Sequence, residues 1–133
     1  MAAGGFIGVD WGTTNRRVFC IDAAGAVTRT ERDGCGILSV PQGGFDAEVA
    51  GLRARFGDAP MLLAGMVGSN RGWVDAGYVD CPATVRDLAA AMANPAEGVW
   101  IVPGVKRVHG TRGDVMRGEE VQLFGAEIGR AHV

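Results

Sequence analysis

The sequence predicts an α/β fold in which a mixed five-stranded sheet is built in the order βββαβαβα. Three observations lead to this prediction. The chain opens with three strand-like segments separated by tight turns, which is typical of an antiparallel meander. After Gly44 the hydrophobic period changes from that of a strand to that of a helix. From there helical and strand-like segments alternate, as they do where helices connect parallel strands.

The predicted strands are short and are bounded by turn residues. Phe6–Val9 is apolar on both faces, which indicates a central strand, and Met61–Ala64 has the same character. Ala26–Arg32 alternates Val with polar residues, as expected of a strand near a sheet edge. The predicted strands are Phe6–Val9, Arg17–Ile21, Ala26–Arg32, Met61–Ala64 and Val99–Val102.

Three segments have the apolar spacing of a helix. In the first, one stripe at i, i+4, i+7 and i+11 is formed by Phe45, Val49, Leu52 and Phe56. Thr84 is the predicted cap of the second helix, which carries an apolar face and stops at Asn94-Pro95. The third is predicted over Val115–Ile128, with Asp114 as its N-cap.

Composition limits the classes of function. A chain of 133 residues has room for one domain. Its net charge of −2 gives no electrostatic reason to expect a nucleic acid or an anionic membrane as partner. Cys20, Cys35 and Cys81 are too widely spaced for a zinc site, and we expect reduced thiols in a cytoplasmic protein. The sequence has neither a signal peptide nor an apolar run long enough to span a bilayer.

The segment Asp10-Trp-Gly-Thr-Thr-Asn15 follows the first predicted strand and precedes the second. Gly12 allows backbone N–H groups to approach a phosphate closely, and Thr13 and Thr14 add hydroxyl donors. Asp10 is a suitable ligand for hydrated Mg²⁺. The alternative is an ordinary hairpin turn, because turns also favour Gly, Thr and Asn.

A second polar loop, Gly65–Trp73, follows the fourth predicted strand. Ligands of open α/β sheets collect at the carboxyl ends of the strands, so both loops, together with the approach to Asp114 after the fifth predicted strand, are expected at one edge. The hydroxyl, amide and guanidinium groups of Ser69, Asn70 and Arg71 suit a polyhydroxylated, carboxylate-bearing molecule. The alternative is a turn with a surface arginine, in which Trp73 is a core aromatic.

Two carboxylates near the end of the chain are candidates for chemistry. At the start of a helix Asp114 would ordinarily be a cap, and the alternative is a general base. Glu120 shares a helical stripe with Met116 and Leu123, so it either faces a site or lies at the helix edge. Glu119 is expected to face solvent.

Three blocks of the sequence resemble a known family. They are Val9-Asp-Trp-Gly-Thr-Thr-Asn15, Gly65-Met-Val-Gly-Ser-Asn-Arg-Gly-Trp73 with Cys81-Pro-Ala83 behind it, and Asp114-Val-Met-Arg-Gly-Glu-Glu120. Together they are similar to the 2-dehydro-3-deoxygalactonokinase family. The first block is shared loosely with sugar kinases of the actin, heat-shock protein and hexokinase superfamily.

The resemblance implies a ribonuclease-H-like fold and a kinase that transfers the γ-phosphate of ATP to the 6-hydroxyl of 2-dehydro-3-deoxy-D-galactonate. It implies ATP and Mg²⁺ as cofactors, with Asp10 as the metal ligand and Asp114 as the catalytic base. The ATP-binding residues it implies are Asp10, Gly12, Thr13, Thr14 and Asn15. The substrate-binding residues it implies are Gly68, Ser69, Asn70, Arg71, Trp73 and Glu120.

The length of the chain departs from the family pattern. The superfamily uses two such domains with ATP between them, so we expect residues 1–127 to be the first and the C-terminal domain to be absent. The last six residues, Ile128–Val133, are what a common sequencing adapter would encode, and we expect an artefactual tail. The alternatives are a different sugar kinase of the same superfamily and a non-catalytic actin-like ligand-binding domain.

Overall fold

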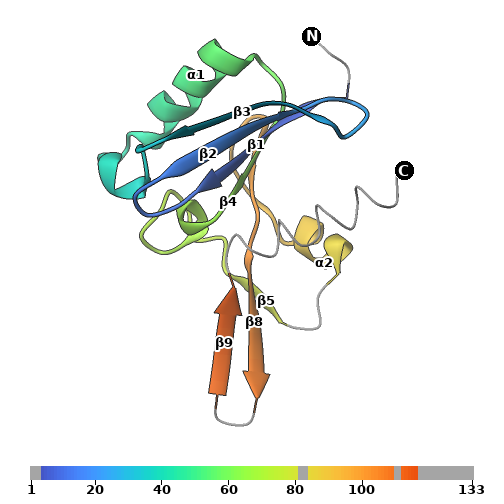
Figure 1. Ribbon diagram of the computed structural model, residues 1–133. Helices are drawn as coiled ribbons and strands as arrows, with labels where there is room; N and C mark the ends of the chain where they lie inside the picture. Colours follow the sequence, from blue (N-terminus) through green and yellow to red (C-terminus); the bar gives the residue numbers. More distant parts are fainter. Residues whose placement is uncertain (1–3, 81–83, 110–111, 117–133) are drawn as a thin grey trace.

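A computed structural model describes residues 4–80, 84–109 and 112–116 of the chain, and its largest element is a mixed β-sheet (Figure 1). The sheet has six strands in the order β3-β2-β1-β4-β7-β6. β1 lies next to β2 in antiparallel and next to β4 in parallel orientation, and β4 is also parallel to β7. The strands are β1 (Phe6–Trp11), β2 (Arg16–Ile21), β3 (Val27–Asp33), β4 (Met61–Ala64), β6 (Ala93–Ala96) and β7 (Val99–Ile101).

The predicted mixed α/β fold is confirmed, and all of the predicted strands lie in this sheet. The predicted number of five strands and the order βββαβαβα are wrong, because β6 adds an antiparallel strand beside β7. The segment Asn94-Pro95 was interpreted as a helix stop and lies instead inside β6. Proline lacks the N–H that a central strand must donate, but the outer side of an edge strand tolerates it.

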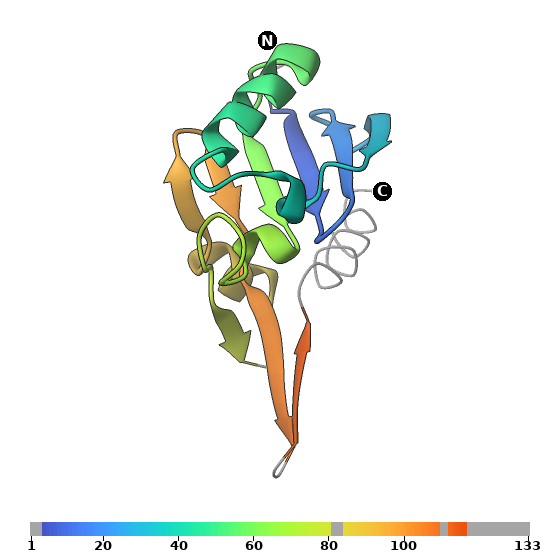
Figure 2. The ribbon, with the colours of Figure 1, turned by 90° about the vertical axis from the view of Figure 1, so that its left-hand side faces the viewer.

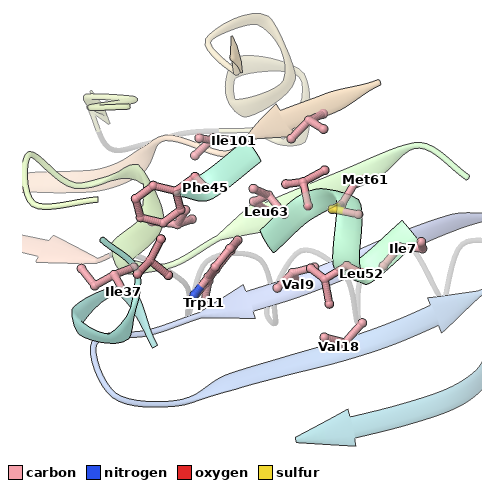
Figure 3. Close-up of a cluster of buried hydrophobic side chains, with 14 residues drawn as sticks. Ile7, Val9, Trp11, Val18, Ile37, Phe45, Leu52, Met61, Leu63 and Ile101 are labelled. Carbon is pink, nitrogen blue, oxygen red and sulfur yellow. The ribbon is translucent and has the colours of Figure 1, made fainter. Parts of the chain in front are cut away.

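Helix α1 (Phe45–Phe56) covers one face of the sheet, and Gly57 ends it with a φ of 104° (Figure 2). Its predicted stripe is confirmed, since Phe45, Val49 and Leu52 are buried and Phe56 packs against the core. Alternate residues of the strands meet this stripe (Figure 3). The sheet side of this core consists of Ile7, Val9, Trp11, Val18, Met61, Leu63, Val99 and Ile101.

A second apolar cluster involves helix α2 (Val85–Ala90), which is shorter than predicted. Leu88 packs there with Ala64, Val102 and Val105. The predicted cap is confirmed, because the Thr84 hydroxyl accepts from the Asp87 N–H and the Asp87 carboxylate accepts from the Thr84 N–H.

A second sheet of three strands was not predicted. Its strands are β5 (Tyr78–Asp80), β8 (Gly104–His109) and β9 (Arg112–Met116). The β8–β9 hairpin extends away from the main sheet (Figures 1 and 2). Val115 and Met116 lie in a strand where a helix was predicted. The remainder of that predicted helix lies outside the described residues, as do the predicted tail and Glu120.

Among the described residues, no helix combines the length and the apolar character needed to cross a membrane.

Candidate active site

The first predicted loop is a tight connection between β1 and β2. The Gly12 N–H donates to the Asn15 carbonyl at 2.9 Å, which closes the turn. Thr13, Thr14 and Asn15 are exposed, and the Asn15 side-chain amide donates to the Thr14 hydroxyl at 3.1 Å. The turn therefore presents two hydroxyl side chains and an amide at the surface.

Asp10 is the second-last residue of β1, so a strand rather than a flexible loop positions its carboxylate. In register it lies opposite Arg17 of β2 on one side and opposite Ala64 of β4 on the other. Residues directly opposite in antiparallel strands have neighbouring side chains, so Arg17 brings a cation to the same face as Asp10. The sequence did not single out Arg17, because only the strand register shows that it faces Asp10.

The two predicted loops meet at Gly65, which directly follows β4. Its φ of 95° and ψ of −152° belong to a region that essentially only glycine adopts. A Cβ at this position would lie 2.8 Å from the Trp11 carbonyl oxygen and 3.3 Å from Asp10 Oδ1. These two loops therefore meet at one sheet edge as predicted, and glycine is what allows them to do so.

The second loop, Gly65–Trp73, is shaped by its own backbone. It begins with the 3₁₀ helix η2 (Met66–Gly68), and the Trp73 N–H returns to the Val67 carbonyl at 2.8 Å. The buried Ser69 hydroxyl donates to the Met66 carbonyl at 2.6 Å and accepts from the Arg71 N–H at 3.3 Å. Of the predicted substrate residues, Gly68 and Ser69 are thus buried in the loop, while Asn70 and Arg71 are exposed.

Trp73 packs against the hydrophobic core. Its ring stacks on Phe45 with 5.7 Å between centroids and an interplanar angle of 7°. The rings of Phe45 and Trp11 in turn pack edge to face, with 5.4 Å between their centroids. This row of rings joins the second loop to α1 and β1. The interpretation of Trp73 as a core aromatic is confirmed, and a direct substrate contact for it stays a prediction.

Asp114 does not cap a helix. It lies in β9, opposite Arg107 of β8, so the predicted N-cap is wrong. The helix that it was predicted to cap begins at Val115, but Val115 and Met116 are the last two residues of β9. Its role as catalytic base stays a prediction, and Glu120 lies outside the described residues.

A charged cluster behind the first loop was missed. Arg16 is only 5% exposed and forms ion pairs of 2.9 Å with Asp33 and with Glu48. The Cys35 thiol lies 3.2 Å from the same Glu48 oxygen that accepts from Arg16. In sequence these four residues carry no motif, because they come from two strands, a helix and the loop between them.

The cluster shifts the pKa values of Asp33 and Cys35. Burial alone would raise the pKa of Asp33, but hydrogen bonds from Arg16 and from the Cys35 N–H, with the charge of Arg16, hold it below its ordinary value. Burial, followed by the hydrogen bond to Glu48, raises the pKa of the Cys35 thiol. The carboxylate therefore stays ionised beside the guanidinium, and the thiol stays protonated.

A surface hollow of about 520 Å³ lies elsewhere, along α1 and next to β6. None of the predicted site residues borders it. Its lining is Asp46, Val49, Ala50, Arg53, Ala54, Asp58 and Ala96. The candidate site is therefore the open edge where the two loops meet and is separate from this hollow.

Fold and loops together define a class: a mixed α/β domain that presents glycine-rich polar loops where neighbouring parallel strands end. The family model described as 2-keto-3-deoxy-galactonokinase matches residues 10–132. The chain belongs to the 2-keto-3-deoxy-galactonokinase family. The match includes both loops and the third block of resemblance.

Individual relatives agree with this assignment. The chain is 35% identical to the "Probable 2-dehydro-3-deoxygalactonokinase DgoK1" of Rhizobium meliloti, with 93% of this chain and 42% of the relative covered. It is 32% identical to the 2-dehydro-3-deoxygalactonokinase of Escherichia coli, with 91% and 42% covered. A crystal structure of a "putative 2-dehydro-3-deoxygalactonokinase protein" from Sinorhizobium meliloti superposes with a TM-score of 0.79 at 35% identity, covering 96% of this chain and 44% of that one. The chain thus spans less than half the length of these relatives.

Proposed function

We propose that this chain is the N-terminal, ribonuclease-H-like domain of a cytoplasmic sugar-acid kinase. The reaction is transfer of the γ-phosphate of ATP to the 6-hydroxyl of 2-dehydro-3-deoxy-D-galactonate. The observation that carries the proposal is the meeting of the two loops at Gly65, within a chain that belongs to this kinase family. In this proposal residues 1–127 form the domain, and a second domain completes the enzyme.

The first loop is the proposed phosphate site. The carbonyls of Gly12 and Thr13 accept hydrogen bonds from Ile37 and Leu38, at 3.0 and 3.2 Å. In the part of the chain that the structure describes, the N–H groups of Thr13 and Thr14 donate to no other group. Free N–H groups, exposed hydroxyls and the nearby Arg17 suit a phosphate, since oriented N–H groups and cations bind anions.

Asp10 is the proposed Mg²⁺ ligand. The described residues contain no group of three His, Cys, Asp or Glu side chains arranged around a metal. Mg²⁺ at phosphate-transfer sites is commonly held by one or two carboxylates together with substrate phosphates and water, so a single aspartate suits it. When bound, the ion would neutralise developing charge on the phosphate oxygens. Asp10 is held by the strand beside the free N–H groups of the loop.

The second loop is the proposed sugar-acid site. Asn70 and Arg71 are its exposed polar side chains, and a guanidinium pairs well with a carboxylate through two parallel hydrogen bonds. Gly68 and Ser69 hold the loop in shape, and Trp73 fixes it to the core. Glu120 is proposed to add a further contact, and Asp114 to accept the proton of the attacking hydroxyl.

A chimera tests the proposal. Residues 1–127 of this chain replace the matching part of the Escherichia coli relative, and ATP-dependent phosphorylation of 2-dehydro-3-deoxygalactonate is measured. We expect turnover by the chimera and none by the chain alone. The matched Asp10→Asn chimera should be folded and inactive. A folded chimera that binds ATP but phosphorylates neither this sugar acid nor a panel of related sugars would contradict the proposal.

A further inference from the structure

Arg16 is a buried cation directly behind the proposed phosphate loop. It is the first residue of β2 and immediately follows Asn15. Its guanidinium forms ion pairs with Asp33 at the end of β3 and with Glu48 of α1, and it lies 5.0 Å from the centre of the Trp11 ring. The desolvation of a guanidinium is unfavourable unless its donors are paired, and here two carboxylates pair it.

The partners of Arg16 all converge on Cys35. The Cys35 N–H donates to Asp33 at 2.9 Å, and its thiol lies 3.2 Å from Glu48. The indole N–H of Trp11 donates to the Cys35 carbonyl at 2.9 Å. Arg16 therefore contacts each group that fixes Cys35: Asp33 and Glu48 through ion pairs, and Trp11 through its ring face.

The residues that follow Cys35 form the back of the loop. The N–H groups of Ile37 and Leu38 donate to the carbonyls of Gly12 and Thr13. A Cβ at Gly36 would collide with the Thr13 carbonyl, so the two backbones pack without space for a side chain. These contacts occupy the carbonyl groups of Gly12 and Thr13 and leave the N–H groups of Thr13 and Thr14 available.

From this chain of contacts we propose that Arg16 is a positioning residue for the loop Asp10–Asn15. Arg16 fixes the position of Cys35 and of the residues that follow it, Ile37 and Leu38. These residues bind the Gly12 and Thr13 carbonyls and thereby set the direction of the phosphate-binding N–H groups. The proposal rests on the proposed function only in naming phosphate as the ligand of the loop.

A role in stability alone is the competing explanation. Buried ion pairs are weak evidence for stability, because replacing them with apolar residues of similar volume is often neutral or stabilising. The test must therefore measure how ordered the loop is, and not only the midpoint of unfolding. Backbone ¹⁵N relaxation of the 133-residue chain gives an order parameter for Thr13 and for Thr14.

The variants are Arg16→Met and Arg16→Lys, with Arg29→Met as the control. Arg29 also pairs with a glutamate and lies 4.4 Å from the centre of an aromatic ring, but it contacts none of the Arg16 cluster. In Arg16→Met we expect the Thr13 and Thr14 order parameters to fall from about 0.85, the rigid value, to below about 0.6. Lysine keeps the charge but lacks the planar fork, so Arg16→Lys should restore the order only in part. Arg29→Met should leave both values unchanged.

Glu48→Gln is a second variant that tests the proposal even where Arg16→Met does not fold. Glu48 is 33% exposed, and the amide keeps its shape while removing its charge, so folding should be retained. We expect a smaller fall in the same two order parameters. Unchanged values in Arg16→Met, or in Glu48→Gln where Arg16→Met does not fold, would overturn the proposal.

A titration with ATP–Mg²⁺ separates this proposal from the proposed function. If the unmodified chain shows no response at Thr13 and Thr14, the phosphate role of the loop fails, and the ligand-free order parameters still decide the role of Arg16. If the unmodified chain responds, Arg16→Met should raise the dissociation constant about tenfold or more. A tenfold rise corresponds to a loss of about 1.4 kcal/mol of binding free energy. An equal dissociation constant in a folded Arg16→Met chain would overturn the proposal.

Discussion

Gly65 is the residue on which the candidate site most depends. Its backbone angles and the nearness of Trp11 and Asp10 both require the absence of a side chain. At Gly25, by contrast, only the angle matters. Its φ is 84°, and no heavy atom lies within 4 Å of the position that a Cβ would take. Comparing Gly65 with Gly25 therefore separates the cost of backbone strain from the cost of a steric collision at the site.

Gly65→Ala should therefore destabilise the chain more than Gly25→Ala. A left-handed angle costs a residue with a Cβ about 1–2 kcal/mol, and Gly25→Ala should show that cost alone. Gly65→Ala adds a collision with the Trp11 carbonyl, so its total should exceed about 3 kcal/mol. Urea unfolding of both variants measures the difference. Equal losses would mean that β1 and the second loop are not packed as described.

Asp33 should make the stability of the domain depend on pH. Its pKa is held below the ordinary value of 3.8, so its contribution is present above that pH and is lost as the pH falls through the lowered pKa. In Asp33→Asn the free energy of unfolding should fall less steeply between about pH 5 and pH 2 than in the unmodified chain. Unfolding by urea at several pH values provides the measurement. Parallel curves for the two proteins would contradict the Arg16–Asp33 pair.

At the scale of elements, α1 was predictable and the β8–β9 hairpin was not. The α1 stripe repeats on one face over three turns, and a buried stripe of this length leaves a clear pattern. The hairpin has no such pattern, because its strands extend away from the main sheet and pair locally (Figure 1). Asp114 was misplaced for this reason: Asp before an apolar run is typical of a helix cap and equally compatible with a strand.

The α1 contact with the sheet can be tested at Leu52, which is 1% exposed in the middle of the core (Figure 3). Leu52→Ala leaves a cavity and should lower the free energy of unfolding by about 2–5 kcal/mol. Val85→Ala is a suitable control, since Val85 of α2 is 38% exposed and should cost less than about 1 kcal/mol. A small effect at Leu52 would show that α1 does not form the core described.

The proposed role of Asp114 as catalytic base leads to a kinetic prediction. If Asp114 is the base, Asp114→Asn in the chimera should lower kcat by about 10²–10⁴ with little change in KM, because the amide cannot accept the proton. Steady-state kinetics with the sugar acid measures both constants. Turnover near that of the unmodified chimera would exclude Asp114 from the role of base.

At the scale of the whole molecule, the sequence predicted the two loops better than the groups that hold them. Asp10–Asn15 and Gly65–Trp73 are continuous segments, so their residue types and strand positions could be recognised together. The Arg16 cluster joins four residues across three elements and a loop, and only the folded chain shows it. Arg17 was missed for the same reason, because its position opposite Asp10 follows from strand register.

The chain covers 42% of its curated relatives, and this bears on how strongly it should bind nucleotide alone. One loop offers N–H groups and hydroxyls to the phosphates, and the proposed second domain would supply the rest of the site. We therefore expect binding of ATP–Mg²⁺ by this chain to be weak, with a dissociation constant on the order of 1 mM.

Amide chemical shifts report directly on the proposed binding of phosphate by the loop Asp10–Asn15. The ¹⁵N-labelled chain is titrated with ATP–Mg²⁺, with adenosine as the control that lacks phosphate. We expect saturable shifts centred on the Thr13 and Thr14 amides with ATP–Mg²⁺, none there with adenosine, and loss of the effect in Asp10→Asn. A folded chain whose Thr13 and Thr14 amides do not respond, while other amides do, would contradict it.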